Sequence, residues 1–389
     1  MKKKAVVLGG GFAGVQAAIE LVKKKMFDVT LVSDRDYLYL YPISIWIPTG
    51  KLDFENAKVS LKDIQKAYKF NLIIEPVLKI NSAENKVLCQ NLTLEYDYLV
   101  IAMGADKMKH QGLENTLSIC GKPEISLAIR ERINSLITRG NGKIAIGFGG
   151  NPLDKSAVRG GPAFELIFNI HNLFVEKNIR NNFELTFFAP MEEPGARMGR
   201  RAMVMVASMF RSFNIKKQYG IKIKAFEPDG VLFENGSKVA SDLTIFIPAS
   251  AGHSILKTSD LKLSEAGFIR IDDNCLAEGT DNVYAVGDIA SLEGPEWKAK
   301  QGHTAEVMAR CAVYNIYNSE KGLRERKGYI KHLSILCVMD TGNGAAFVYR
   351  DNKKAFVIPM LVVGHLLKKG WGKYVRAVKT GKLPRLPGL

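Results

Sequence analysis

Cysteine is scarce in this chain, and the few cysteines fit neither a disulfide framework nor a zinc site. Five are spread over 389 residues, and no two of them form a C-x-x-C pair. Disulfide-rich domains usually carry an even number of cysteines at characteristic spacings, and structural zinc sites use closely spaced pairs. Both classes are therefore excluded, and we predict no metal site.

Long hydrophobic runs are absent as well. The longest apolar run, residues 355–367, has 13 residues, whereas a helix needs about 20 to cross a bilayer. We therefore expect no transmembrane helix. The composition is that of a globular protein, 47% hydrophobic and 24% charged. Strand-like apolar runs alternate with longer helical patterns, which predicts an α/β fold with parallel sheets.

Acidic residues are missing from residues 352–389, which hold nine lysines or arginines. The whole chain has 55 basic and 39 acidic residues, a formal charge of +16. More than half of the excess positive charge therefore lies in this C-terminal segment. Such a concentration favours an anionic partner, either nucleic acid or an anionic membrane surface.

A glycine-rich motif lies at the N-terminus. An apolar strand is followed by Gly9-x-Gly11-x-x-Gly14 and then by a helical pattern. In such motifs the first glycine permits a tight turn, the second lets backbone amides approach a pyrophosphate, and the third allows close helix packing. The next strand ends at Ser33-Asp34, about 20 residues further on, where a side chain binds the adenosine ribose. The usual acid is displaced by one position, so Ser33, Asp34 or both are candidates.

Two later segments separate FAD from NAD as the cofactor. One apolar strand ends in the small-residue turn Ala102-Met103-Gly104, and another ends in Gly287-Asp288. In this order the motifs resemble those of the two-dinucleotide-binding-domain flavoproteins. The resemblance implies two Rossmann-like domains, with the FAD domain split in sequence and the second domain inserted. It also implies that Asp288 binds the ribitol of FAD.

A closer resemblance rests on three further segments. They are residues 117–129 (LSICGKPEISLAI), 160–166 (GGPAFEL) and 336–348 (LCVMDTGNGAAFV). Together with the FAD motifs they cover nearly the whole chain and are similar to the sulfide:quinone oxidoreductases. Flavocytochrome c sulfide dehydrogenase and type II NADH:quinone oxidoreductase are related families. The resemblance implies FAD as cofactor, a small sulfur compound as electron donor and quinone as acceptor.

The resemblance also implies three functional cysteines, of which this chain keeps two. The first position falls on Cys120 and the third on Cys337, but the middle position is Arg159. In the family the middle and last cysteines carry the growing sulfur chain, so that disulfide cannot form here. Because a thiolate is the attacking species, we hypothesise that Arg159 lowers the pKa of Cys337 or binds an anionic donor. The alternative is a surface arginine and a buried, inert thiol.

A second glycine motif, residues 147–152 (GFGGNP), is impaired as a nucleotide site. Pro152 stands where a small residue should let helix and strand pack closely. The following strand ends at Ala189-Pro190 without the acid that would hold ribose hydroxyls, although Glu192 and Glu193 lie just beyond. This pattern favours a retained Rossmann scaffold that no longer binds NADH.

The remaining site residues follow from the family resemblance. Glu165 matches a glutamate near flavin and quinone, where it could relay protons; alternatively, it is a helix N-terminal acid stabilised by the dipole. Pro42 lies where flavocytochrome c attaches FAD through a cysteine, so FAD is expected to be non-covalent. Lys300 and the start of its helix are expected to stabilise negative charge on the flavin. The expected FAD contacts are Gly9, Gly11, Phe12, Ala13, Gly14, Ser33, Asp34, Arg35, Pro42, Val77, Ala102, Gly104, Gly287, Asp288, Lys300 and Gln301.

Residues 355–385 mix apolar residues with the basic cluster at helix-like spacing. An amphipathic helix at a membrane interface fits this pattern better than nucleic-acid binding, and relatives use this segment as a monotopic anchor beside a quinone tunnel. Gly364, Gly370 and Gly372 are expected to break the helix into shorter pieces. The alternative is that the apolar residues pack on the flavin domain while the lysines stay in solvent.

The expected organisation has two Rossmann-like domains and a C-terminal membrane-associating segment. Residues 1–108 and 263–330 would form the FAD domain, residues 109–262 the second domain, and residues 331–389 a flavin-capping and amphipathic segment. We expect a peripheral, monotopic protein on the cytoplasmic membrane. A homo-oligomer is compatible with the sequence.

The predicted function is that of an FAD-dependent oxidoreductase that passes two electrons from sulfide, or a related small sulfur donor, to membrane quinone. The predicted catalytic residues are Cys337, Cys120, Glu165 and Arg159. The first alternative is a type II NADH:quinone oxidoreductase. The second is a non-catalytic FAD-binding membrane protein, which the missing middle cysteine would favour.

Overall fold

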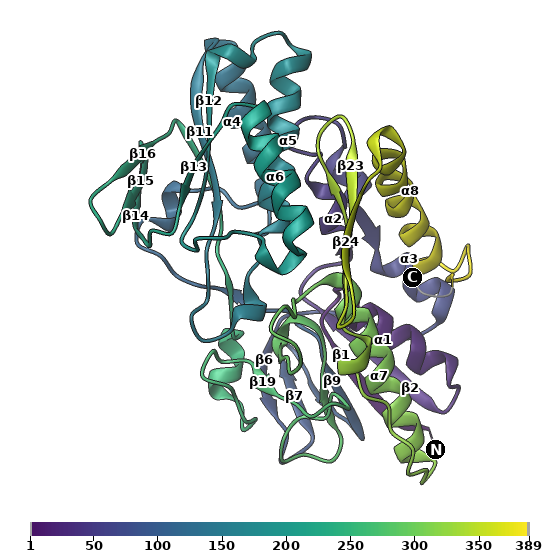
Figure 1. The fold of residues 1–389 in the computed structure, drawn as a ribbon. Coiled ribbons are helices and arrows are strands. Elements are labelled where there is room, and N and C mark those ends of the chain that lie inside the picture. Colours follow the sequence, from purple (N-terminus) through teal and green to yellow (C-terminus); the bar gives the residue numbers. More distant parts are fainter. Residues whose placement is uncertain (1, 387–389) are drawn as a thin grey trace.

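The structure is a computed structural model that describes residues 2–386. It contains two parallel sheets and a C-terminal unit of three strands and one helix (Figure 1). The α/β class expected from the sequence is confirmed. No helix of residues 2–386 is long and apolar enough to cross a membrane.

Five parallel strands form the sheet that carries the N-terminal glycine motif. In spatial order they are β20 (Val283–Ala285), β9 (Tyr98–Ile101), β1 (Lys3–Leu8), β2 (Phe27–Ser33) and β5 (Asn71–Ile74). Its helices α1 (Phe12–Lys23) and α7 (Gly302–Glu320) pack against each other (Figure 1). Because β20 and α7 come late in the sequence, the chain returns to this sheet after it has built the second one.

The second sheet is also parallel and lies in the segment between β9 and β20. Its order is β13 (Ile215–Tyr219), β12 (Phe183–Ala189), β11 (Gly142–Phe148) and β17 (Leu243–Ile247), and its helices are α4 (Ile125–Arg139), α5 (Gly161–Glu176) and α6 (Arg200–Ser212). The ring of Phe164 on α5 stacks on that of Phe187 on β12, with centroids 4.5 Å apart. This aromatic contact fixes the N-terminal half of α5, which carries Glu165. The exact domain boundaries at residues 108, 262 and 330 stay a prediction.

Smaller elements connect and cover these sheets. Two three-stranded antiparallel sheets consist of β6 (Val77–Asn81), β7 (Lys86–Cys89) and β8 (Thr93–Glu95), and of β14 (Ile223–Glu227), β15 (Gly230–Phe233) and β16 (Lys238–Ala240). The short pairs are β3 (Tyr37–Tyr39) with β4 (Lys58–Ser60), β10 (Asp106–Lys107) with β18 (Ser250–Ala251), and β19 (Ile269–Arg270) with β21 (Ala290–Ser291). Helices α2 (Tyr41–Ser44) and α3 (Leu61–Tyr68) lie near the C-terminal helix (Figure 1).

The C-terminal unit corrects the expected long amphipathic helix in two ways. Residues 355–359 are a strand, β24 (Ala355–Pro359), which pairs with β23 (Ala345–Arg350) and through it with β22 (Ile335–Asp340). Helix α8 (Leu361–Lys379) is continuous, so its glycines do not break it. A Cβ on Gly364 would lie 2.7 Å from the Cβ of Ala345, and one on Gly372 would lie 2.9 Å from Ile43. These two glycines therefore serve close packing, which the helix gains by contact with its neighbours.

The exposure pattern of α8 is the reverse of that of an ordinary surface helix. Its exposed apolar residues include Leu361, Val362 and Leu366, with 75%, 62% and 60% of their surface accessible. Lys368 and Lys379, in contrast, are buried and form ion pairs with Glu165 and Glu306. The alternative in which the apolar residues pack inward and the lysines stay in solvent holds only in part, because Val375 is buried and Lys369 and Lys373 are exposed.

Candidate active site

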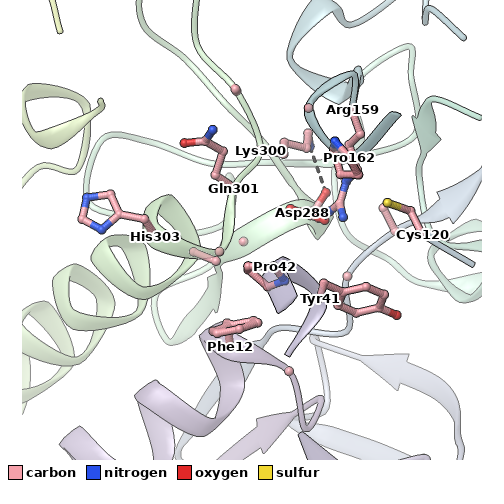
Figure 2. A pocket seen from close by; sticks show the side chains of 18 of the residues that line it. Phe12, Tyr41, Pro42, Cys120, Arg159, Pro162, Asp288, Lys300, Gln301 and His303 are labelled. Carbon is pink, nitrogen blue, oxygen red and sulfur yellow. Dashed lines mark hydrogen bonds and ion pairs between the residues drawn. The ribbon is translucent and has the colours of Figure 1, made fainter. Parts of the chain in front are cut away.

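The carboxyl ends of four strands bring the FAD motifs to one edge of the first sheet. Gly9 follows β1, Ser33 ends β2, Ala102 follows β9 and Gly287 follows β20. In parallel sheets, ligands bind outside the carboxyl ends of the strands. A cavity of about 2480 Å³ lies there. Every expected FAD contact lines it except Gly14, together with Cys120, Arg159, Glu165 and Cys337. Figure 2 shows part of this wall, with Phe12, Asp288 and Arg159 labelled.

The glycine motif forms a tight turn whose open side faces the cavity. Gly9 has a φ of +109°, and a Cβ on this residue would clash with the carbonyl of Ala102. Gly14 packs directly against the carbonyl of Gly9, which explains why it does not line the cavity. Gly11 caps α1, and a Cβ there would meet no atom within 4 Å. The amides at the start of α1 are thus accessible to a pyrophosphate.

Ser33 and Asp34 have different surroundings at the ribose end. The hydroxyl of Ser33 is buried and donates to the carbonyl of Arg35 at 2.7 Å, which closes the turn after β2. The side chain of Asp34 is 72% exposed, and its carboxylate lies 3.8 Å from the Arg35 guanidinium. Asp34 is therefore the residue with acceptor oxygens available to ribose hydroxyls.

Three buried polar atoms of residues that line the cavity have no hydrogen-bond partner within residues 2–386. They are Oε1 of Gln301, which caps α7, Nε of Arg159 and Nε2 of His110. Buried polar atoms are nearly always hydrogen-bonded, because leaving one unpaired costs about 1–3 kcal/mol. With the glycine turn and Gly287, whose φ is +77°, these atoms make a wall suited to a polar ligand. The residues present therefore fit FAD.

Arg159 forms an ion pair with Asp288 across the cavity (Figure 2). Both side chains are largely buried. Asp288 is the carboxylate expected to bind the ribitol of FAD, so the guanidinium stands beside the expected flavin position. Arg159 is therefore not the surface residue of the alternative reading.

Lys300 is bound to the backbone of the Gly287-Asp288 segment. It lines the cavity, but its ammonium donates to the backbone carbonyls of Asp288 at 2.9 Å and Ala290 at 2.5 Å. Burial lowers the pKa of Lys300 to about 7, against the opposing effect of Asp154. Lys300 thus holds the Gly287-Asp288 segment in place, and a direct contact with the flavin stays a prediction.

A long loop, which carries Arg159, separates the second glycine motif from the start of α5. Strand β11 ends at Phe148, whereas α5 begins only at Gly161. The side chain of Asn151 donates to the carbonyl of Ser250 at 2.9 Å and accepts from the amide of Leu153 at 2.9 Å. No helix N-terminus therefore follows the glycines directly, and a pyrophosphate would lack the usual amide contacts there.

Cys337 lies beside a buried ion pair between Glu165 and Lys368. Burial raises the pKa of the Cys337 thiol to about 12; Glu165 raises it further, and Lys368 opposes the shift. The cation that acts on Cys337 is thus Lys368 on α8, which corrects the hypothesis that Arg159 does so. Burial also raises the pKa of Glu165, while Lys368 lowers it. Glu165 is therefore more than a solvent-exposed helix N-terminal acid.

Sequence reasoning missed a second carboxylate in this network. The side chain of Asp340 is buried; its amide donates to Glu165 Oε1 at 2.8 Å, and its Oδ2 lies 2.7 Å from Nδ1 of His365. The side-chain amide of Asn169 bridges Asp340 Oδ1 and the carbonyl of Glu165, both at 2.8 Å. Asp340 lay within the DTG segment used for the family resemblance. Lys368 and His365 were not predicted as site residues, because the sequence analysis placed their helix, α8, at the membrane surface.

Cys120 lies at another part of the same cavity. It is a buried free thiol, and Figure 2 shows it near Arg159, away from Gln301 and His303. The hydroxyl of Tyr41 donates to the carbonyl of the next residue, Gly121, at 3.2 Å. Cys120 and Cys337 therefore share the cavity, and their roles in catalysis stay predictions.

Helix α8 supplies the apolar wall of the cavity. Its residues Val363, Leu366, Leu367 and Trp371 line it, and the ring of Trp371 stacks near that of Phe12 with centroids 6.4 Å apart. Leu361 and Val362, which precede them on α8, are exposed and do not line the cavity. The apolar wall is therefore continuous along α8 with exposed apolar residues outside the cavity.

Comparisons with known proteins agree with this geometry. The family described as pyridine nucleotide-disulphide oxidoreductase matches residues 3–309. The chain is 28% identical over 407 residues to the sulfide-quinone reductase of Aquifex aeolicus, covering 96% of this chain and 90% of the relative. It is 21% identical over 330 residues to a probable NADH dehydrogenase of Dictyostelium discoideum, covering 80% and 72%. The crystal structure of the sulfide:quinone oxidoreductase from Aquifex aeolicus superposes with a TM-score of 0.88 at 25% identity, over 98% of this chain and 92% of that one.

Proposed function

Because the chain belongs to the pyridine nucleotide-disulphide oxidoreductase family, we propose that it is an FAD-dependent oxidoreductase that passes two electrons from sulfide, or a related small sulfur donor, to quinone. One observation carries the proposal. A single cavity connects the glycine turn and Asp288 with Cys337 and the apolar wall of α8. The similarity to sulfide-quinone reductase extends over nearly the full length of both chains, which supports the same substrates here.

The chain's own residues have separable tasks in this reaction. The amides at the start of α1 hold the pyrophosphate of FAD, and Asp34 and Asp288 hold its hydroxyls. FAD, bound non-covalently, supplies the two-electron chemistry between donor and acceptor. Cys337 would bond to the donor sulfur beside the flavin, with both sulfurs losing a proton and the pair of electrons passing to bound FAD as the S–S bond forms; Lys368 would favour the thiolate, because burial alone keeps the thiol protonated. Glu165 releases a proton to the quinone oxygen as the electrons arrive.

Cys120 and Arg159 act on the donor side in this proposal. Arg159 lies where the cationic guanidinium can attract an anionic sulfur compound, such as hydrosulfide, and Cys120 serves as an accessory thiol. Lys107 lines the same cavity, and burial lowers its pKa to about 8, so its charge varies near neutral pH. With only two of the three family cysteines, the sulfur chain cannot be held between the usual pair.

NADH is the competing electron donor. Relatives include a probable NADH dehydrogenase, but the second glycine motif lacks the helix start that would bind the pyrophosphate of NADH. The loop is held instead by Asn151, which contacts Ser250 and Leu153. The geometry therefore favours a sulfur donor over NADH.

Anaerobic addition of each donor to the purified flavoprotein tests this choice. We expect sulfide to bleach the oxidised flavin absorbance band and NADH to leave it unchanged at the same concentration. Subsequent addition of a quinone should restore the band. Bleaching by NADH alone would establish the alternative function, and bleaching by neither donor would favour a non-catalytic FAD-binding protein.

The exposed face of α8 is proposed to rest on the surface of the cytoplasmic membrane. It presents Leu361, Val362 and Leu366 next to Lys369 and Lys373, all of which are exposed. Apolar side chains at the acyl boundary and lysines at anionic headgroups are the arrangement of a monotopic helix. The apolar cavity wall would then open towards the bilayer, where quinone is dissolved.

Replacing both Leu361 and Val362 with serine tests the membrane contact. Neither residue lines the cavity, so FAD content should stay unchanged. We expect binding to anionic liposomes to weaken by about tenfold or more, because roughly 1.5–3 kcal/mol is gained for each buried large apolar side chain. Binding of the unchanged protein should also weaken at high salt.

The matched control is Val204→Ser on α6, which is exposed but lies on another helix. It should bind liposomes like the unchanged protein. If the double variant binds as tightly as Val204→Ser, α8 is not the membrane contact.

A further inference from the structure

The contact between Asp340 and His365 is not used by the proposed function. Oδ1 of Asp340 accepts from Asn169 Nδ2 at 2.8 Å and from the amide of Gly342 at 2.9 Å, and both donors are neutral. Oδ2 lies 2.7 Å from Nδ1 of His365. Within residues 2–386, His365 is the one side chain at hydrogen-bond distance of this carboxylate that can carry a positive charge.

Asp340 is joined to Glu165 by fixed contacts. Its amide donates to Oε1 of Glu165 at 2.8 Å, and Asn169 donates to both residues. The negative charge of Asp340 raises the pKa of Glu165, in the same direction as the larger effect of burial. Any change in the net charge of Asp340 and its partner therefore acts on the proton affinity of Glu165.

His365 connects this buried network with the outside. Its side chain is 26% exposed, and its ring centroid lies 4.9 Å from that of Trp46, which follows α2. Protons can therefore reach the ring without passing through the cavity. The charged groups of the elements packed around it are Asp340 on β22, Glu165 on α5, Lys368 on α8 and, beyond Gly342, the ion pair of Lys51 with Glu176.

We propose that His365 is a positioning residue for quinone reduction, which acts on Glu165 through Asp340. When its ring takes up a proton at the exposed edge of α8, the imidazolium compensates the charge of Asp340, and Glu165 releases its proton to the quinone oxygen more readily. When the ring loses that proton, the uncompensated Asp340 favours uptake of a new proton by Glu165. Each quinone takes two electrons and two protons, so the network is reset with every proton delivered. This inference rests on the proposed function.

The test is the variant His365→Gln, whose side-chain amide can still donate to Asp340 but cannot take up a proton. The flavin is first reduced with dithionite under anaerobic conditions, which makes the measurement independent of the natural donor. Reoxidation by a soluble ubiquinone analogue is then followed by stopped flow from pH 5 to pH 9. Histidine is the side chain that ordinarily changes charge between about pH 5 and 8.

We expect the rate of reoxidation of the unchanged protein to depend on pH. In His365→Gln this dependence should be lost, and the rate at the acidic end should be about tenfold lower, equivalent to about 1.4 kcal/mol of barrier. His332→Gln, a histidine outside the cavity, should behave like the unchanged protein.

The outcomes separate the two levels of the proposal. A pH profile of His365→Gln that matches the unchanged protein would overturn the role of His365 and leave the proposed function intact. If quinone fails to reoxidise the unchanged flavoprotein, the proposed function is wrong and the role of His365 falls with it. A reoxidation rate lowered equally at every pH would mean that His365 is structural only, and would also overturn the inference.

Discussion

Cys337→Ser is expected to abolish flavin reduction by sulfide while leaving FAD bound. Cys337 lies beside Glu165 and Lys368 at the cavity wall, and it is the only residue of this group that can form a bond to sulfur. A serine hydroxyl keeps the volume nearly unchanged but does not form a thiolate. Loss of a nucleophile typically lowers the rate by about three orders of magnitude or more.

The measurement is the rate of flavin bleaching under anaerobic sulfide, with the flavin content of each protein determined first. Cys89→Ser is the matched control, because Cys89 is a buried free thiol on β7 that does not line the cavity. Cys120→Ser should give a smaller loss, in keeping with an accessory thiol. A Cys337→Ser protein that is bleached within threefold of the normal rate would show that Cys337 is not the thiol that bonds to the donor sulfur.

Lys368→Met is expected to give the largest loss of stability of any single substitution discussed here. Lys368 and Glu165 are both buried and form an ion pair. Removing one partner leaves an uncompensated buried charge, which costs about 3–5 kcal/mol. The expected result is a lower free energy of unfolding of the FAD-bound protein in urea.

The pH dependence of that loss identifies its cause. Burial already places the pKa of folded Glu165 above its ordinary value, so this group contributes less stability as pH rises above about 4.5, where the unfolded carboxyl ionises. Without Lys368 the pKa of Glu165 rises further. The loss in Lys368→Met should therefore be larger at pH 8 than at pH 5.

The double variant Glu165→Gln with Lys368→Met is the control for this explanation. Glutamine can still accept the hydrogen bond from the amide of Asp340, and no charge remains buried at that position. Most of the lost stability should return. If the double variant is as unstable as Lys368→Met, and the loss does not vary with pH, lost packing of the lysine stem explains the effect.

The FAD motifs could be predicted because each depends on a few adjacent residues. Gly9 needs a positive φ, Gly11 needs an open side and Gly14 needs close packing, and all three requirements are visible in local spacing. The meeting of Ser33, Ala102 and Gly287 at one sheet edge follows from parallel strand order. The impaired second motif was equally local, because Pro152 and the delayed start of α5 lie within one short segment.

The function of α8 could not be predicted in the same way. Apolar residues and lysines at helical spacing indicate an amphipathic helix, but they do not say which face is buried. Lys368 and Lys379 are buried because each forms an ion pair with a carboxylate on another element, Glu165 and Glu306 respectively. Both carboxylates are far from these lysines in the sequence. The reversed pattern depends on partners that only the tertiary structure brings together.

The sequence by itself therefore determined the cofactor site, the family resemblance and the set of thiols, because these reside in contiguous motifs. Only the tertiary structure decided which charged side chains form ion pairs and hydrogen bonds with one another. It paired Arg159 with Asp288 instead of Cys337, turned Lys300 towards backbone carbonyls, and joined His365 to Glu165 through Asp340. Ion pairs and buried hydrogen bonds join residues distant in the chain, and their partners are fixed by how the helices and sheets pack.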